Sequence, residues 1–110
     1  MFISVWEFGM DNLRILVIGR HAQIMDTVLR LLHSQPGWQA AGALTDEEAQ
    51  RLFAAQPFDL VLIGGGVEEN AEAVLRKEFS ARNPAIKIIR HYGGGSGLLF
   101  NEVRHALHAS

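Results

Sequence analysis

Glycines and basic residues follow three of the apolar runs in this sequence, and these residue types could bind a ligand. They are Gly19, Arg20 and His21 after the first run, Gly64 and Gly65 after the third, and Arg90, His91, Gly94, Gly95 and Ser96 after the fourth. Glycines let backbone N–H groups approach a ligand closely, and arginine presents a planar fork of donors that matches phosphate or carboxylate. The combination predicts a site for an anionic group, such as a phosphate, a carboxylate or a nucleotide tail.

The same residues have a second interpretation, in which the glycines only make tight turns and the two arginines pair with Glu68, Glu69 or Asp26. The glycine-rich stretch at 93–97 matches neither the G-x-G-x-x-G pattern of dinucleotide-binding proteins nor the P-loop, which also needs a lysine. The sequence alone leaves both interpretations open.

No catalytic centre, metal site or cofactor is predicted. His105 and His108 can share one helix face, but they have no acidic residue at ligand spacing, and the chain has no cysteine. Ser96 lacks the second glycine of a G-x-S-x-G nucleophile motif, because position 98 is leucine. His21 lacks the flanking Asp and Gly of cobalamin-binding modules. We therefore expect a protein that is not an enzyme.

The composition predicts one domain of an ordinary soluble protein. The chain has 110 residues, of which 48% are hydrophobic, and a net charge of -2. It can therefore build a single core, and its charge does not favour nucleic acid or an acidic membrane as a partner. The absence of cysteine agrees with a reducing, cytoplasmic location. Residues 1–12 form an apolar arm that is too short to span a bilayer, so we expect it to pack within the chain or across a dimer.

Short apolar runs alternate with segments of helical period, which predicts βα units around a parallel sheet. Strands are expected at 14–18, 39–44, 59–63 and 86–89, and helices from the early twenties to near Pro36, at 46–56, at 69–81 and from 97 or 98 to about 108. Right-handed crossovers favour the strand order 2-1-3-4. The second strand is rich in alanine and glycine, so we expect it at an edge with a helix packed closely over it.

Helical periodicity selects the apolar residues that should enter the core. Those expected to be buried are Ile24, Val28, Leu31 and Leu32 in the first helix, Val74 and Phe79 in the third, and Leu99, Val103, Ala106 and Leu107 in the last. Thr45 and Glu48 have the spacing of a capping box at the start of the second helix. Ser96 is expected to cap the last helix.

The order of these elements resembles the receiver domain of bacterial two-component response regulators over residues 13–92. The strongest stretches are "LLHSQPGWQAAGALTDEEA" and, as the third strand, "PFDLVLI". The resemblance implies a flavodoxin-like, three-layer α/β sandwich in residues 13–110, shorter by one βα unit than a receiver. It leaves open whether the last helix corresponds to a fourth helix or to a displaced fifth one.

The positions that carry the chemistry of receivers are all altered in this chain. Receivers have an acidic pair after the first strand, an acceptor Asp ending the third and a Ser or Thr ending the fourth. Here these positions hold Gly19 and Arg20, Gly64, and Arg90, and the Lys that ends a fifth strand has no counterpart. Phosphoryl transfer needs the carboxylate nucleophile and Mg²⁺ held by oxygen ligands. The resemblance therefore implies a degenerate pseudo-receiver that is not phosphorylated by the aspartate mechanism.

Our leading functional prediction is a non-catalytic signalling domain that acts through protein–protein interaction, as a homodimer or with another signalling protein. The missing βα unit leaves the fourth strand as an edge where a second subunit or residues 1–12 could pack. The alternative is a sensor that binds a small anionic ligand or nucleotide at the glycine-rich carboxyl edge of the sheet. Neither function involves nucleic acid, a membrane or a cofactor.

Overall fold

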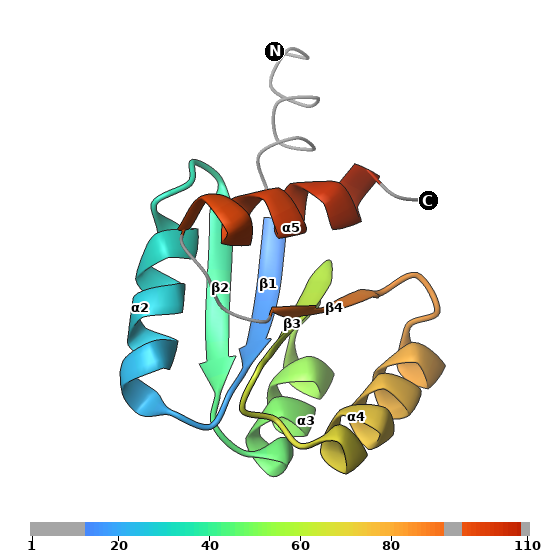
Figure 1. The fold of residues 1–110 in the computed structure, drawn as a ribbon. Coiled ribbons are helices and arrows are strands. Elements are labelled where there is room, and N and C mark those ends of the chain that lie inside the picture. The colour runs from blue at the N-terminus through green and yellow to red at the C-terminus, as the bar shows by residue number, and fades with distance from the viewer. Residues whose placement is uncertain (1–12, 92–95, 109–110) are drawn as a thin grey trace, which may run out of the picture.

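A computed structural model of the protein describes residues 13–91 and 96–108. They form a parallel sheet with helices on both sides (Figure 1). In chain order the elements are β1 (Leu13–Ile18), α2 (Ala22–His33), β2 (Trp38–Ala43), α3 (Asp46–Ala55), β3 (Leu60–Gly64), α4 (Glu69–Arg82), β4 (Lys87–His91) and α5 (Ser96–His108). All predicted strands and helices are present, with small differences at their ends. The predicted apolar arm at 1–12 lies outside the described residues.

The strand order is β2-β1-β3-β4, as predicted. β1 pairs with both β2 and β3, so that Ile15 lies opposite Ala40 on one side and Leu60 on the other. β4 pairs with β3 and places His91 opposite Gly64. Because all strands are parallel, the carboxyl ends of β1, β3 and β4 meet at one edge of the sheet. This edge carries the residues of the predicted site.

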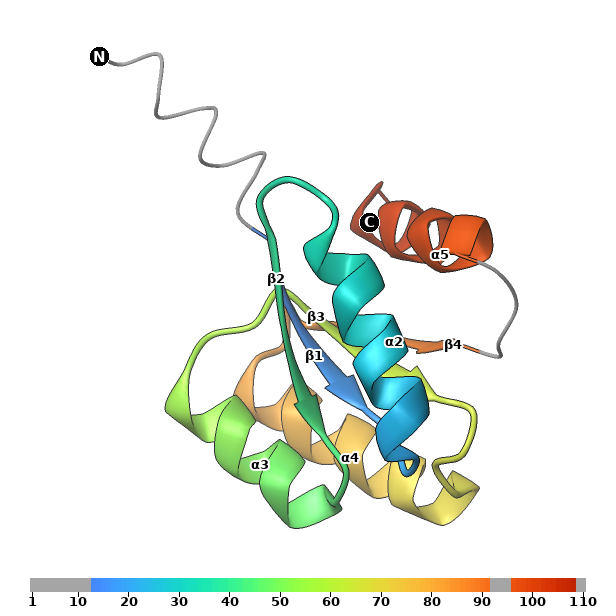
Figure 2. The same ribbon diagram turned by 90° about the vertical axis from the view of Figure 1, so that its left-hand side faces the viewer.

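Helices cover both faces of the sheet, which gives the molecule three layers (Figure 2). α2 and α5 pack on the face that carries Ile15 and Val17 of β1, whereas α3 and α4 pack on the face that carries Leu16 and Ile18. Successive side chains of a strand point to opposite faces. The continuous apolar run of β1 is therefore buried on both sides. Among the described helices, none is long and apolar enough to cross a membrane.

The last helix, α5, crosses the strands near their amino ends instead of running along them (Figure 1). The Phe100 ring meets the Trp38 ring edge-on, with ring centroids 6.2 Å apart. The Arg104 guanidinium lies 5.8 Å from the centroid of the Trp38 ring and donates to the Gln35 side chain at 2.9 Å. Since Trp38 begins β2, these contacts hold α5 over the amino end of the sheet. α5 therefore shares a face with α2 but covers a different part of it.

Three apolar residues that we expected in the core are exposed. They are Ile24 (61% exposed), Val74 (53%) and Leu107 (37%). α2 buries Met25 and α4 buries Leu75 instead, and one residue further along a helix is about 100° around its axis. Leu107 lies at the margin of the buried apolar stripe of the last helix, which contains Val103 and Ala106. Leu32, Phe79, Leu99, Val103 and Ala106 are buried as predicted, whereas Val28 and Leu31 are partly buried.

The start of α3 is capped as predicted, with one difference in detail. The Thr45 hydroxyl accepts a hydrogen bond from the Glu48 N–H at 3.1 Å. The Glu48 carboxylate accepts from the N–H of Leu44, also at 3.1 Å, so the return bond reaches one residue further back than in a standard capping box. α5 begins at Ser96 itself, and the Ser96 side chain lies outside the description.

The contact between β2 and α2 is close, as the small residues of β2 predict. A Cβ atom at Gly42 would lie 2.6 Å from Sδ of Met25 and 3.1 Å from a methyl carbon of Leu29. Such distances leave no room for a side chain, so glycine lets α2 sit directly on the edge strand.

Candidate functional site

Arg20 lies in the turn between β1 and α2, and its side chain reaches the starts of two other helices. Its Nη2 atom is 2.6 Å from Asp46 Oδ1, in the first residue of α3, and 3.3 Å from Glu68 Oε1, just before α4. Nη1 donates to the carbonyl oxygen of Leu44 at 3.2 Å. The Arg20 side chain is only 21% exposed. Its guanidinium therefore joins the turn after β1 to the starts of α3 and α4.

Arg90, near the end of β4, makes a second network at the same edge. It forms an ion pair with Glu72 of α4 and donates to the carbonyl oxygens of Gly65 at 3.0 Å and Val67 at 2.8 Å. The other carboxylate oxygen of Glu72 accepts from Arg76 at 2.8 Å. Arg90 and Glu72 are each 15% exposed. Arg90 thus holds the loop between β3 and α4 against β4.

Burial and ion pairing act in opposite directions on these charged groups. Burial on its own would raise the pKa of Glu72, but hydrogen bonds and charges from Arg76 and Arg90 outweigh it and lower that pKa. Burial would also lower the pKa of Arg20, and its contacts with Asp46 and Glu68 outweigh burial and raise it. Both groups are therefore charged at neutral pH.

The two arginines are thus engaged with carboxylates, in line with the second interpretation of the sequence. Glu68 was among the partners expected there, whereas Asp46 and Glu72 were not. A phosphate or carboxylate ligand at either arginine would have to compete with these protein carboxylates. The site for an anionic group stays a prediction.

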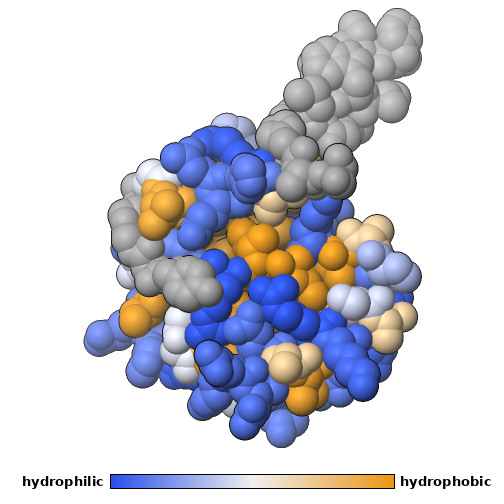
Figure 3. All heavy atoms as spheres, turned by 45° about the vertical axis from the view of Figure 1, so that its right-hand side comes forward, coloured by the Kyte–Doolittle hydropathy of each residue, from blue (hydrophilic) through white to orange (hydrophobic). Residues whose placement is uncertain are grey.

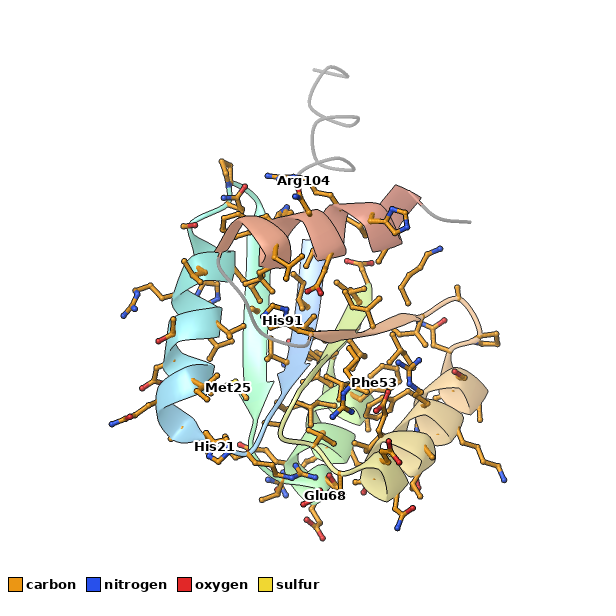
Figure 4. The ribbon with its side chains drawn as sticks, in the orientation of Figure 1. His21, Met25, Phe53, Glu68, His91 and Arg104 are labelled. Atoms are coloured by element: carbon orange, nitrogen blue, oxygen red, sulfur yellow. The ribbon has the colours of Figure 1, made fainter. Side chains whose placement is uncertain are left out.

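A groove of about 480 Å³ lies at the carboxyl ends of β1 and β3, beside α2 and next to the start of α5. Six of the predicted site residues line it, namely Gly19, Arg20, His21, Gly64, Gly65 and His91. The rest of the lining is mainly apolar and includes Val17, Met25, Val28, Leu31, Leu62 and Leu99. In Figure 4, His21 and Met25 approach the groove from the side of α2 and His91 from the side of β4.

The other predicted site residues are placed differently. Arg90 is not part of the groove lining, because its side chain is directed to α4 and the loop before it. Gly94 and Gly95 lie outside the described residues. Ser96 begins α5. The structure therefore brings together the glycines and basic residues that follow β1 and β3, with His91 from β4.

His91 is held by a partner that the sequence did not indicate. Its Nδ1 atom is 2.5 Å from Oε1 of Glu102 in α5, and the two side chains are 13% and 23% exposed. Because a carboxylate oxygen accepts hydrogen bonds, this contact is a hydrogen bond in the tautomer that carries a proton on Nδ1. Within the ranges 13–91 and 96–108, no three His, Asp or Glu side chains come together in a way that could hold a metal ion.

Sequence reasoning missed Asp46, Glu72 and Glu102, which are 26, 18 and 11 residues from their basic partners. Asp46 and Glu72 did carry a usable signal, because both are acidic residues in the first turn of a helix. A helix that follows a parallel strand starts at the carboxyl edge of the sheet, where the arginines also lie. Glu102 lies inside α5 and carried no such signal.

Comparison with known proteins shows similarity in structure and not in sequence. No protein-family model matches the chain, and no curated protein matches it at a significant level.

Solved receiver domains resemble the fold over most of its length. A signal receiver domain of an HD domain-containing protein from Pseudomonas fluorescens Pf-5 matches with a TM-score of 0.76 and 18% identity, over 87% of this chain and 94% of that one. A CheY-like response regulator receiver domain protein from Methanospirillum hungatei JF-1 matches with a TM-score of 0.74 and 16% identity, over 87% and 94%. A chain from the complex of histidine kinase ThkA with response regulator protein TrrA matches with a TM-score of 0.68 and 22% identity, over 86% and 98%. The chain therefore has the flavodoxin-like fold of response regulator receiver domains.

Proposed function

We propose that this chain is a non-catalytic, receiver-like signalling domain that binds other protein chains and takes up no phosphoryl group by the aspartate mechanism. The position of Arg20 carries this proposal. Where receivers have an acidic pair that holds a metal ion, this chain has a guanidinium whose charge is bound by Asp46 and Glu68. The guanidinium engages both carboxylates, so a divalent metal ion would have to displace Arg20 to reach oxygen ligands here.

The acceptor and hydroxyl positions support the same proposal. Gly64 has no carboxylate to act as the nucleophile, and a Cβ atom there would lie 3.2 Å from the carbonyl oxygen of Ile18. Arg90 donates to the carbonyl oxygens of Gly65 and Val67. The loop after β3 is therefore held by contacts within the protein, without a phosphoryl group.

Incubation of the protein with acetyl phosphate and Mg²⁺ is expected to leave its mass unchanged, because neither a nucleophilic carboxylate nor a metal site is available. Intact-protein mass spectrometry measures this directly, with a receiver domain that keeps its acceptor Asp as the positive control. A stable adduct of roughly 80 Da, the mass of one phosphoryl group, would contradict the proposal.

The proposed partner surface is the side of the molecule where β4 ends the sheet. In the part of the chain that the structure describes, no strand pairs with the outer edge of β4. All residues of β4 are partly exposed, whereas Leu60 to Ile63 of β3 are buried. Ile86 just before β4, and Ile88 and Ile89 within it, are only partly buried where they pack against the core. Figure 3 shows apolar residues gathered at the centre of this side with hydrophilic ones around them. Such a surface suits packing against a second protein chain.

We take the second chain to be a copy of the same protein, so sedimentation at micromolar concentration is expected to show twice the monomer mass. Ile86→Lys should shift the protein towards monomer, because a charge on this surface must be desolvated in the dimer. Ile24→Lys adds the same charge on the exposed face of α2 and should leave the dimer intact. Circular dichroism of Ile86→Lys checks that this variant is folded, because Ile86 also packs against the core. A wild-type monomer that is unchanged by deletion of residues 1–10 would remove the support for a homodimer.

A further inference from the structure

The groove beside α2 is apolar on its inside and polar at its rim. Val17 and Leu62 of the sheet, Met25 and Val28 of α2, and Leu99 of α5 form its walls. Its volume of about 480 Å³ is within the range of small-molecule sites. Apolar walls offer water few hydrogen bonds, so a molecule with an apolar body gains free energy by replacing that water.

His91 supplies a polar group of defined hydrogen-bonding character at this groove. Oε1 of Glu102 lies 2.5 Å from Nδ1 of His91 and accepts a hydrogen bond from the Nδ1–H tautomer. In a neutral imidazole the second nitrogen, Nε2, is then an acceptor. The contact with Glu102 also holds the imidazole ring in place, because His91 belongs to β4 and Glu102 belongs to α5. A ligand that donates an N–H or O–H to Nε2 would therefore meet an acceptor that is already oriented.

The charges around the groove disfavour an anionic ligand. Arg20 is paired with both Asp46 and Glu68, so it contributes no net positive charge. His91 faces the carboxylate of Glu102. A bound anion would lose its hydration and gain no unpaired cation in return. A neutral molecule avoids this cost.

We propose that this groove binds a small neutral molecule that has an aromatic or similarly flat apolar body and one N–H or O–H group, which donates to Nε2 of His91. This function goes beyond protein binding and does not depend on whether the chain takes up a phosphoryl group. It makes the domain a ligand-binding protein as well as an interaction module.

Indole is a suitable probe, because it combines a flat apolar ring system with a single N–H donor. Indole is expected to raise the melting temperature of the wild-type protein in a concentration-dependent way, since a ligand of the folded state stabilises it. In ¹H–¹⁵N spectra, the amide signals of Gly19, Gly64 and Gly65 should shift. The amide signals of Phe53 and Phe58, on the opposite face of the sheet, should not.

Two matched variants locate the binding. Val28→Phe places a larger side chain in the groove and should weaken indole binding by about tenfold or more. Val74→Phe makes the same change on the exposed side of α4 and should leave binding unchanged. If Val28→Phe does not fold, the shifts of the glycine amides in the wild-type protein decide the question.

Inorganic phosphate is the competing probe and is expected to leave both the melting temperature and the glycine amides unchanged. A response to phosphate without a response to indole would overturn this proposal in favour of an anion site, and so would the absence of any response to indole. Indole binding and phosphoryl uptake are measured separately, so either proposal can fail without the other.

Discussion

Replacing Phe79 by alanine is expected to lower the free energy of unfolding by about 3–5 kcal/mol, the range for removing a large aromatic side chain from a core. Phe79 is 1% exposed. Its ring stacks on that of Phe53 with centroids 4.3 Å apart, so it joins α4 to α3 beneath the sheet. Because single domains have stabilities of about 5–15 kcal/mol, the variant should lose a large part of its stability. Urea unfolding followed by circular dichroism measures the change.

Val74→Ala is the matched control for this experiment, because it truncates an apolar side chain of the same helix that is 53% exposed. Its effect should stay within about 0.5 kcal/mol. Equal losses for the two variants would mean that α4 does not bury the face that carries Leu75 and Phe79.

Replacing Arg90 by alanine is expected to lower the free energy of unfolding by about 2–3 kcal/mol at neutral pH. The variant removes one of the two cations bound to Glu72 and leaves the carbonyl oxygens of Gly65 and Val67 without this donor. The estimate is below the full cost of breaking a buried ion pair, because Arg76 still binds Glu72. Urea unfolding at several pH values measures the difference between the variant and the wild type.

The pH dependence of that difference identifies its electrostatic part. The pKa of Glu72 is lowered in the folded protein, so the ionised carboxylate contributes stability above the ordinary Glu pKa. This contribution is lost as the pH falls through the lowered pKa. The difference between wild type and Arg90→Ala should therefore shrink in acid, and what persists reports the bonds to the two carbonyl groups. Arg51→Ala removes the same charge from an exposed position of α3 and should show little effect at any pH.

The networks of Arg20 and Arg90 connect several segments at the carboxyl edge of the sheet. In this chain the turn after β1, the loop after β3 and the starts of α3 and α4 are joined by protein side chains. The proposed routes of regulation are therefore a partner chain and a ligand in the groove. The indole and sedimentation experiments address these two routes.

The fold was accessible from the sequence because its signals are local. The continuous apolar runs of β1 and β3 predicted buried strands, the small residues of β2 predicted a close-packed edge, and Thr45 marked the start of α3. Predictions were weaker where the signal depends on rotation about a helix axis. Ile24 and Val74 were assigned to the core, but their apolar neighbours Met25 and Leu75 are the buried residues. Spacing alone does not distinguish between two adjacent apolar residues.

By itself, the sequence determined the order of strands and helices, the glycine at the end of β3 and the gathering of glycines and basic residues at one edge of the sheet. Only the tertiary structure decided that Arg20 binds Asp46 and Glu68, that Glu102 holds His91, and that α5 crosses the sheet so that an apolar groove lies beside α2. The physical reason is that periodicity and caps depend on neighbouring residues. The partner of a long charged side chain and the crossing of a helix depend on distances in space between segments far apart in the chain.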